Sequence, residues 1–176
     1  MQNTMRATTM AMAVLMIAGC HTGPCGGCPD YETCNPATNA CVLNTGARFD
    51  LWATTGHVDG DNWDPFFGPP DPYICVTPPG HEELCTSNIS DSHSPKWNQQ
   101  VAVDLDGATL IGAPLHVRYE DSDVDSPDLI CQGTIAFTAE YVHDGGIGFR
   151  CSNGSASANF DLRATFVGTN PLAATP

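Results

Sequence analysis

Five aspartates have the type and spacing needed to hold a divalent cation. They fall in two loop-like segments, and they are Asp64, Asp71, Asp121, Asp123 and Asp128. Calcium prefers about six to eight hard oxygen ligands, which five carboxylates can supply. Asp121 and Asp123 are two residues apart, so in extended backbone their side chains point the same way. The pattern predicts a calcium site, although the acidic segment 121–128 taken alone is more typical of a solvated turn.

Length, composition and charge limit what else the chain can be. Its 176 residues suit about one domain, and 41% apolar residues are enough for a packed core. Twenty acidic residues face six basic ones, a formal charge of −14, and Lys96 is the only lysine. A surface for the phosphate backbone of nucleic acid is therefore excluded.

Short alternating stretches must position these aspartates. Apolar residues recur at every second position in 49–53, 73–77, 101–105, 115–119, 135–139 and 160–166. Loops rich in Gly, Pro, Asp and Ser separate them, and no helical stripe of useful length follows residue 20. Such strands predict an all-β fold, an antiparallel β-sandwich over residues 47–168, with 169–176 as a tail.

Three motifs in this segment occur in a particular order. They are DPFFGPPDPY at 64–73, SPKWN at 94–98 and LHVRYEDSDVDSPD at 115–128. Together they resemble the C2 domain, a calcium-dependent membrane-binding module. The resemblance implies an eight-stranded antiparallel sandwich that binds two or three calcium ions between loops at one end. It assigns Asp64 and Asp71 to the first calcium loop, and it assigns the other three aspartates to the third.

The chain departs from the family pattern in two places. One extra residue separates Asp64 from Asp71, and the spacing before Asp128 is one residue shorter than usual. Three aromatic residues flank the first calcium loop, namely Trp63, Phe66 and Phe67. They either contact a membrane interface, as loop tips do in the family, or pack against the end of the sandwich. The lysine-rich strand with which many relatives bind phosphoinositides is absent.

The first twenty residues have the features of an export signal. Arg6 precedes an apolar run that is too short to span a bilayer comfortably. The run ends in IAGC at 17–20, which resembles the lipobox of bacterial lipoproteins. The resemblance implies cleavage after residue 19 and acylation of Cys20, and His21 in place of aspartate implies the outer membrane. An ordinary signal peptide cut nearby is the alternative.

Eight further cysteines remain after Cys20. Removing residues 1–19 removes Arg6 and no acid, so the mature chain carries five basic and twenty acidic residues, a charge of −15. An exported chain favours disulfides over the zinc or redox function that the CGGC segment at 25–28 also suggests. Residues 20–46 then form a lipid anchor and a disulfide-rich spacer with Cys25, Cys28, Cys34 and Cys41. In the sandwich, Cys75 and Cys85 flank a turn, which leaves Cys131 to pair with Cys151.

These observations predict a non-enzymatic lipoprotein of the bacterial outer membrane, exposed to the periplasm or the cell surface. Its calcium-binding C2-like domain attaches, through calcium, to a second membrane, a glycan or a protein. Neither a nucleophile–base pair nor a phosphate-binding glycine loop is evident. A structural envelope module that does not bind calcium, and an accessory to a calcium-dependent enzyme, are the alternatives. The sequence identifies neither the target nor the oligomeric state.

Overall fold

The computed structural model describes residues 25–60, 68–123, 126–153 and 157–170. In chain order the elements are β1 (Glu32–Asn35), β2 (Ala40–Leu43), β3 (Ala47–Val58), β4 (Pro72–Thr77), β5 (Leu84–Cys85), β6 (Lys96–Asp106), α1 (Gly107–Gly112), β7 (Leu115–Asp121), β8 (Asp128–Ile135), α2 (Ala139–His143), β9 (Ile147–Ser152) and β10 (Ser157–Thr169). Within the described ranges, no helix has both the length and the apolar character that crossing a bilayer requires.

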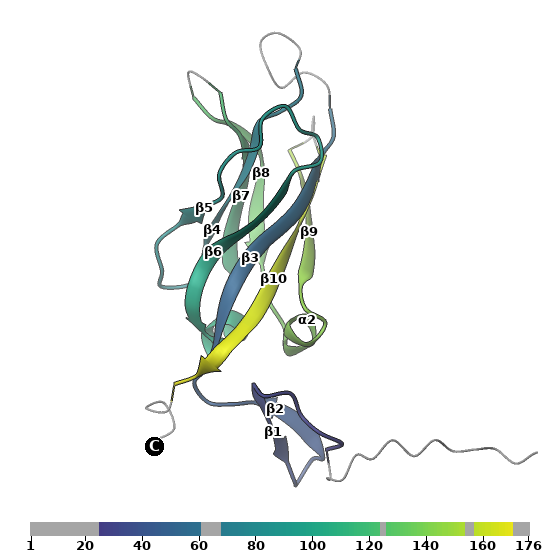
Figure 1. Cartoon of the computed structure of the whole chain (residues 1–176), viewed down its shortest axis with the longest axis vertical. Coiled ribbons are helices and arrows are strands. Elements are labelled where there is room, and N and C mark those ends of the chain that lie inside the picture. The colour runs from purple at the N-terminus through teal and green to yellow at the C-terminus, as the bar shows by residue number, and fades with distance from the viewer. Residues whose placement is uncertain (1–24, 61–67, 124–125, 154–156, 171–176) are drawn as a thin grey trace, which may run out of the picture.

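Two four-stranded antiparallel sheets form a sandwich (Figure 1). One has the strand order β6-β3-β10-β9 and the other has the order β5-β4-β7-β8. The two longest strands pair from Ala47 opposite Thr169 to Val58 opposite Ala158, so they run the length of the domain. The predicted all-β, eight-stranded sandwich is confirmed.

The core lies between the sheets and follows the predicted alternation in three strands. In β3, β7 and β10 the inward residues are almost completely buried, and they are Phe49, Leu51, Ala53, Leu115, Val117, Tyr119, Phe160, Leu162 and Ala164. Aromatic rings join the two layers, since Tyr119 lies 5.8 Å from Trp97 and 5.7 Å from Phe160 between ring centroids. Edge-to-face pairs of this kind stabilise a core beyond the area they bury.

Two of the predicted alternating stretches are wrong in detail. In β6, Val101 is buried whereas Val103 is 53% exposed. The cause is a β-bulge: between two paired positions, β6 has one residue more than β3. Asp104, which lies in this bulge, has a φ of 52°. In the stretch 135–139, the strand ends at Ile135 and Ala139 begins α2, so Ala139 is exposed.

In β4 the inward face is the opposite of the one predicted. Ile74 and Val76 enter the core, whereas Tyr73 and Thr77 are half-buried on the outer side. Both faces of β4 carry apolar residues, so alternation alone does not distinguish them. Beside β4, β5 is only two residues long. The chain then continues along β4 irregularly, and the backbone N–H of Thr86 donates to the carbonyl of Ile74 at 2.9 Å.

Four disulfides join the eight cysteines from Cys25 onward. In the sandwich they link Cys75 to Cys85 and Cys131 to Cys151, the pairs favoured by the sequence. In the N-terminal segment they link Cys25 to Cys34 and Cys28 to Cys41. This segment contains the β1–β2 hairpin, in which Cys34 lies opposite Cys41. The two bonds compensate for the small apolar core that so short a segment can build.

The cystine hairpin packs onto the end of the sandwich (Figure 1). The Tyr31 ring lies 5.6 Å from that of Phe49 and 5.7 Å from that of Phe166. Leu43 lies against Gly107, where a Cβ would come within 3.0 Å of the leucine side chain. The backbone N–H of Asn170 donates to the carbonyl of Gly46 at 2.9 Å. The hairpin is therefore packed on the sandwich and does not form a separate unit.

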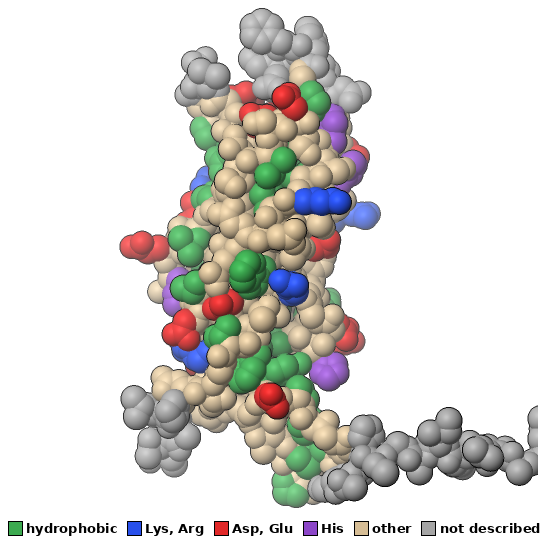
Figure 2. Space-filling view, in the orientation of Figure 1, with side chains coloured by type: hydrophobic (Ala, Val, Ile, Leu, Met, Phe, Trp, Pro, Cys, Tyr) green, Lys and Arg blue, Asp and Glu red, His purple; other side chains and the backbone are tan. Residues whose placement is uncertain are grey.

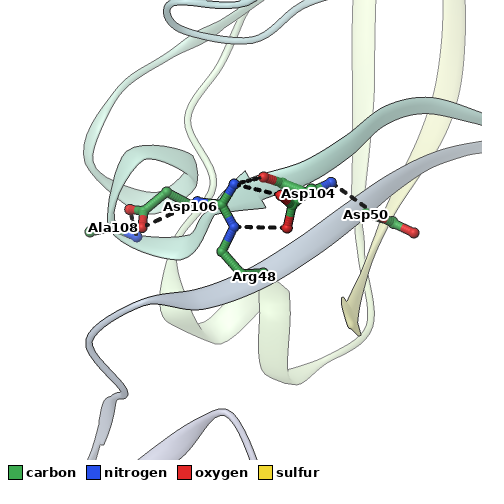
Figure 3. A network of polar contacts seen from close by, with 5 residues as sticks. All are labelled: Arg48, Asp50, Asp104, Asp106 and Ala108. Carbon is green, nitrogen blue, oxygen red and sulfur yellow. Dashed lines mark hydrogen bonds and ion pairs between the residues drawn. The ribbon is translucent and has the colours of Figure 1, made fainter. Parts of the chain in front are cut away.

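A polar network secures the same end of the sandwich (Figure 3). The guanidinium of Arg48 on β3 donates to the carboxylate of Asp104 at 2.9 and 3.0 Å and also to its backbone carbonyl. The backbone N–H of Asp104 donates to Asp50 at 3.0 Å. Asp106 caps α1 by accepting from the backbone N–H of Ala108. These aspartates support the fold of this end and lie away from the predicted calcium loops.

Candidate metal centre

Three connections meet at the end of the sandwich opposite the hairpin (Figure 1). They join β3 to β4, β5 to β6 and β7 to β8, and backbone hydrogen bonds link their described parts. Ser122 N–H donates to the carbonyl of Asp71 at 3.1 Å, and Ser92 N–H donates to the carbonyl of Pro70 at 2.7 Å. Figure 2 shows acidic side chains on the described surface at this upper end. We call this region the loop end.

Of the acidic side chains that the structure describes at the loop end, that of Asp121 is the most deeply buried. It is the last residue of β7, it lies on the same inward face as Tyr119, and it is 0% exposed. Its Oδ1 accepts a hydrogen bond of 2.6 Å from the backbone N–H of Asp71. In the sheet Asp121 pairs with Pro72 on one side and with Asp128 on the other. The register therefore places Asp128 opposite Asp121, and Asp71 lies directly before the β4 residue that pairs with Asp121 on the other side.

Asp71 connects all three loops. Its N–H binds Asp121, its carbonyl accepts from Ser122, and its carboxylate Oδ1 accepts from the backbone N–H of Asp91 at 2.7 Å. Asp91 has a φ of 54°, a left-handed conformation that Asp adopts more readily than most residues. Sequence reasoning missed Asp91. Its only signal was a turn-rich loop, SNISDSHSP, that does not indicate which backbone group faces Asp71.

The remaining predicted ligands differ in how the structure places them. β7 ends at Asp121, so Asp123 lies beyond the strand, where the extended-backbone reasoning no longer applies, and it is half-buried. Asp128 begins β8 and is exposed. Asp64, together with Trp63, Phe66, Phe67 and the acylation candidate Cys20, lies outside the described residues.

The chemistry of this donor set fits calcium, but the described carboxylates lie too far apart to share one ion as they stand. All predicted ligands are carboxylates, the hard oxygen ligands that calcium prefers, and the side chain of Asp121 is fully buried. Among the described residues, no three of these carboxylates have oxygens within 4.8 Å of one another. A site therefore needs Asp64 or rotation of the side chains. The clusters that do meet this distance contain Cys25 and Cys75, whose sulfurs are held in disulfides.

Asp59, a nearby acidic residue, has other partners. It accepts a hydrogen bond from the Ser157 hydroxyl and lies 3.2 Å from Nε2 of His57. The hydrogen bond from Ser157, followed by the attraction of His57, lowers the pKa of Asp59 below its ordinary value. Asp59 thus stays ionised and serves the junction of β3 and β10.

On the outer face of the second sheet, acidic side chains surround Arg118. This arginine donates to Glu83 at 2.7 and 3.0 Å and to Glu120 at 2.6 Å. Burial and a hydrogen bond to Glu120 raise the pKa of Tyr73 to about 12, so its hydroxyl remains protonated. This face lines a groove of about 500 Å³. Because the guanidinium is already neutralised there, the face offers little attraction to an anionic ligand.

The Arg118–Glu83 pair predicts a defined pH dependence. The hydrogen bond from Arg118 lowers the pKa of Glu83 below its ordinary value of 4.5. The contribution of this pair to folding stability is therefore complete above pH 4.5, and it is lost as the pH falls through the lower pKa of the folded state. Both side chains are more than a third exposed, so solvent screening limits the contribution to about 0.5 kcal/mol. In urea denaturation we expect Glu83→Gln to be less stable than wild type at pH 7 and equal to it in acid. Glu82→Gln is the control, and a difference that widened in acid would contradict the assignment.

Two four-stranded antiparallel sheets with acidic connections at one end (Figure 2) define a class of β-sandwich modules. The family model of the C2 domain matches residues 55–148, so the chain belongs to the C2 domain family.

Solved structures agree in fold. The calcium-bound pair of C2 domains of extended synaptotagmin 2 aligns with 18% identity and a TM-score of 0.50, covering 70% of this chain and 46% of that one. A C2 domain of a plant extended synaptotagmin 1 aligns with 12% identity and a TM-score of 0.50, covering 71% and 98%. At such identities the likeness concerns the fold alone. A search of curated protein sequences found no significant match.

Proposed function

We propose that the protein is a lipid-anchored, non-enzymatic envelope protein whose C2 domain binds calcium at the loop end and thereby attaches to a membrane. The observation that carries this proposal is the connection of Asp71 to both neighbouring loops. Its N–H reaches the buried Asp121 carboxylate at 2.6 Å, and its own carboxylate reaches Asp91 at 2.7 Å. The C2 family and the calcium-bound structural relative support the choice of ligand.

The residues of the loop end have distinct parts in such a site. Asp71, Asp121, Asp123 and Asp128, with Asp64, would hold the ions. Bound calcium would supply positive charge that offsets these carboxylates and attracts anionic headgroups. The chain itself contributes a fixed frame, because the β4–β7–β8 pairing sets the positions of Pro72, Asp121 and Asp128 in register. Because these carboxylates would repel one another without metal, calcium is expected to stabilise the folded chain.

The anchor is the second part of the proposal. The IAGC segment at 17–20 follows a short apolar run, and Cys20 is the one cysteine outside the four disulfides. Several acyl chains on Cys20 would hold the protein firmly, since each buried methylene contributes about 0.8 kcal/mol. The proposed location is the outer membrane of a bacterial envelope.

One observation favours a second candidate, a structural C2 module that does not bind calcium. Among the described residues, the carboxylates do not come within 4.8 Å as a group of three. In this case the acidic loops stay solvated and the sandwich serves only to hold other envelope components.

Thermal melting and vesicle binding of the same chain separate the two candidates. With Cys20→Ser, which cannot be acylated, we expect 10 mM calcium to raise the Tm relative to chelator by roughly 10 °C if Kd is about 10⁻⁴ M. The same chain should co-sediment with phosphatidylserine-containing vesicles in calcium and not in chelator. Coincident melting curves would exclude the calcium site and leave the structural module. A calcium shift without co-sedimentation would exclude only the membrane as target.

A further inference from the structure

Trp52 is an aromatic residue on the outer face of the first sheet, β6-β3-β10-β9. On β3 it alternates with Leu51 and Ala53, which are buried in the core, so its half-buried ring lies on the opposite side. The register places Trp52 between Gln100 on β6 and Arg163 on β10. The Cζ atom of Arg163 lies 5.9 Å from the centroid of the indole. An aromatic ring and a guanidinium thus lie together on the outer face of this sheet.

A groove of about 320 Å³ adjoins this pair of side chains. It is lined by Thr54 of β3, by Asp161 and Arg163 of β10, and by residues 144–148, which connect α2 to β9. Its volume lies at the lower end of the range of about 300–1,000 Å³ that is usual for sites of small ligands. Figure 2 views this side of the molecule, where hydrophobic, basic and acidic side chains are interspersed.

Two glycines shape the wall that residues 144–148 form. A Cβ on Gly146 would come within 2.5 Å of the carbonyl oxygen of Leu162, so only glycine lets the connection lie this close to β10. A Cβ on Gly148 would come 3.2 Å from Oδ1 of Asp161. Glycine at this second position therefore leaves space beside the carboxylate that lines the groove.

Asp161 and Arg163 have hydrogen-bonding capacity that the protein itself does not use. Oδ2 of Asp161 accepts from the Thr55 hydroxyl at 2.8 Å, and its backbone carbonyl accepts from the Thr54 hydroxyl at 3.2 Å. Within the described part of the chain, Oδ1 of Asp161 has no hydrogen-bond donor and the Arg163 guanidinium has no partner besides the Trp52 ring. Positions 161 and 163 share one face of β10, so both groups are available to one ligand.

This set of side chains has the chemistry that recognises a neutral sugar. A carboxylate accepts from sugar hydroxyls and a guanidinium donates to them, and such charge-assisted hydrogen bonds are stronger than neutral ones. A pyranose ring whose hydroxyls are all equatorial has a flat C–H face that packs against an indole. Asp144 on the far wall leaves the groove with a small acidic excess, which disfavours anionic sugars. The free guanidinium of Arg163 in turn disfavours a cation.

We propose that the groove beside Trp52 binds a neutral glycan built of hexose or N-acetylhexosamine units with equatorial hydroxyls. We call it the Trp52 groove. It contains none of the predicted calcium ligands, and α2, next to one wall, lies toward the hairpin end of the sandwich (Figure 1). Binding there needs neither calcium nor a lipid anchor, so the inference goes beyond the proposed function and stands or fails separately from it. One ring among polar neighbours offers less apolar surface than the core of a protein interface requires.

Calorimetric titration in chelator tests the proposal, with the full chain carrying Cys20→Ser and with cellotetraose and chitotetraose as probes. We expect saturable binding of at least one of these neutral tetrasaccharides, with the same affinity when calcium replaces the chelator. Polygalacturonate, an anionic polymer, should bind more weakly. Absence of binding to both tetrasaccharides, a requirement for calcium, or tighter binding of polygalacturonate would each overturn the proposal.

Substitutions on two strands locate the site. Trp52→Ala should lower the affinity at least about tenfold, as the loss of a central aromatic contact does, whereas Trp52→Phe keeps an aromatic face and should retain most of it. Because Trp52→Ala can also weaken the sheet, Asp161→Asn is the second variant. It preserves an acceptor for Thr55, and the loss of hydrogen bonds to a charged group should again lower the affinity about tenfold.

Glu82→Gln is the matched control for Asp161→Asn, because it removes the same charge from an exposed position in the connection between β4 and β5. It should bind the tetrasaccharide like wild type. Circular dichroism and the Tm of each variant establish that it is folded. Wild-type affinity in folded Trp52→Ala and in Asp161→Asn would show that the glycan binds elsewhere and overturn the site. An equal loss in Glu82→Gln would attribute the effect to net charge and overturn it as well.

Discussion

Asp121→Asn should abolish the stabilisation by calcium and lower calcium affinity by about 100-fold or more. Asp121 is the fully buried carboxylate of the loop end, and the sheet register places it between Pro72 and Asp128. Affinity for calcium falls steeply when negative charge is removed from the ligand set. Even the loss of a residue that only orients a ligand lowers metal affinity by about 10–100-fold. Asparagine keeps an oxygen that accepts from the N–H of Asp71, so the calcium-free fold should be retained. Isothermal titration calorimetry and melting curves in calcium and chelator provide the two readouts.

Asp144→Asn is the matched control, because it removes the same charge from an exposed position at the end of α2. We expect wild-type calcium affinity for this variant. If Asp121→Asn bound calcium as tightly as wild type, Asp121 would not be a ligand, and the assignment of the third loop would fail. If both variants weakened binding equally, the effect would come from net charge and not from coordination.

Phe49→Ala should lower the free energy of unfolding by about 3–5 kcal/mol, the cost of removing a buried phenylalanine from a packed core. Phe49 is 1% exposed, and its ring lies 5.8 Å from Phe166 and 5.6 Å from Tyr31 of the hairpin. The substitution therefore removes the ring on which Tyr31 of the hairpin packs, and it also leaves a cavity in the core. In a domain of ordinary stability this is a large fraction of the total. Urea denaturation followed by circular dichroism measures it.

Two comparisons make this result specific. Val167→Ala changes a residue that is 50% exposed, and it should cost less than about 0.5 kcal/mol. The double variant Tyr31→Ala/Phe49→Ala should cost less than the sum of the single variants, because the rings contact each other. Strict additivity would mean that the hairpin does not depend on Phe49. Calcium affinity of the folded Phe49→Ala protein should be unchanged, since the loop end lies at the other end of β3.

Strand positions were predictable wherever one face of a strand is apolar and the other polar. β3, β7 and β10 follow this rule, and their inward residues were identified correctly. The rule failed at β4, which has apolar residues on both faces, and at Val103, where a positive φ at Asp104 shifts the register. Neither a bulge nor the burial of a disulfide-bonded face leaves a periodic signal in one sequence. The contact of Tyr31 with Phe49 could not be predicted either, because a contact between separate segments leaves no local pattern in the sequence.

The candidate site was predictable in its residue types and less so in its geometry. The order of the motifs predicted that Asp71 and Asp121 belong together, and a 2.6 Å hydrogen bond joins them. The participation of Asp91 through its backbone N–H could not be predicted, since any residue type offers the same donor. Calcium coordination by the five aspartates remains a prediction that the variants above test.

The two-residue β5 has a consequence for many copies gathered on the proposed membrane. The proposed lipid anchor would concentrate the protein in two dimensions, where a long exposed edge strand would offer a template for pairing with a neighbour. Here the edge of β4 is occupied by a short strand bonded through Cys75–Cys85 and then by the irregular contact of Thr86 with Ile74. The bonds along this edge of β4 therefore come from a two-residue strand and an irregular segment, not from a long regular strand. This edge therefore offers a poor template for sheet growth between neighbouring copies.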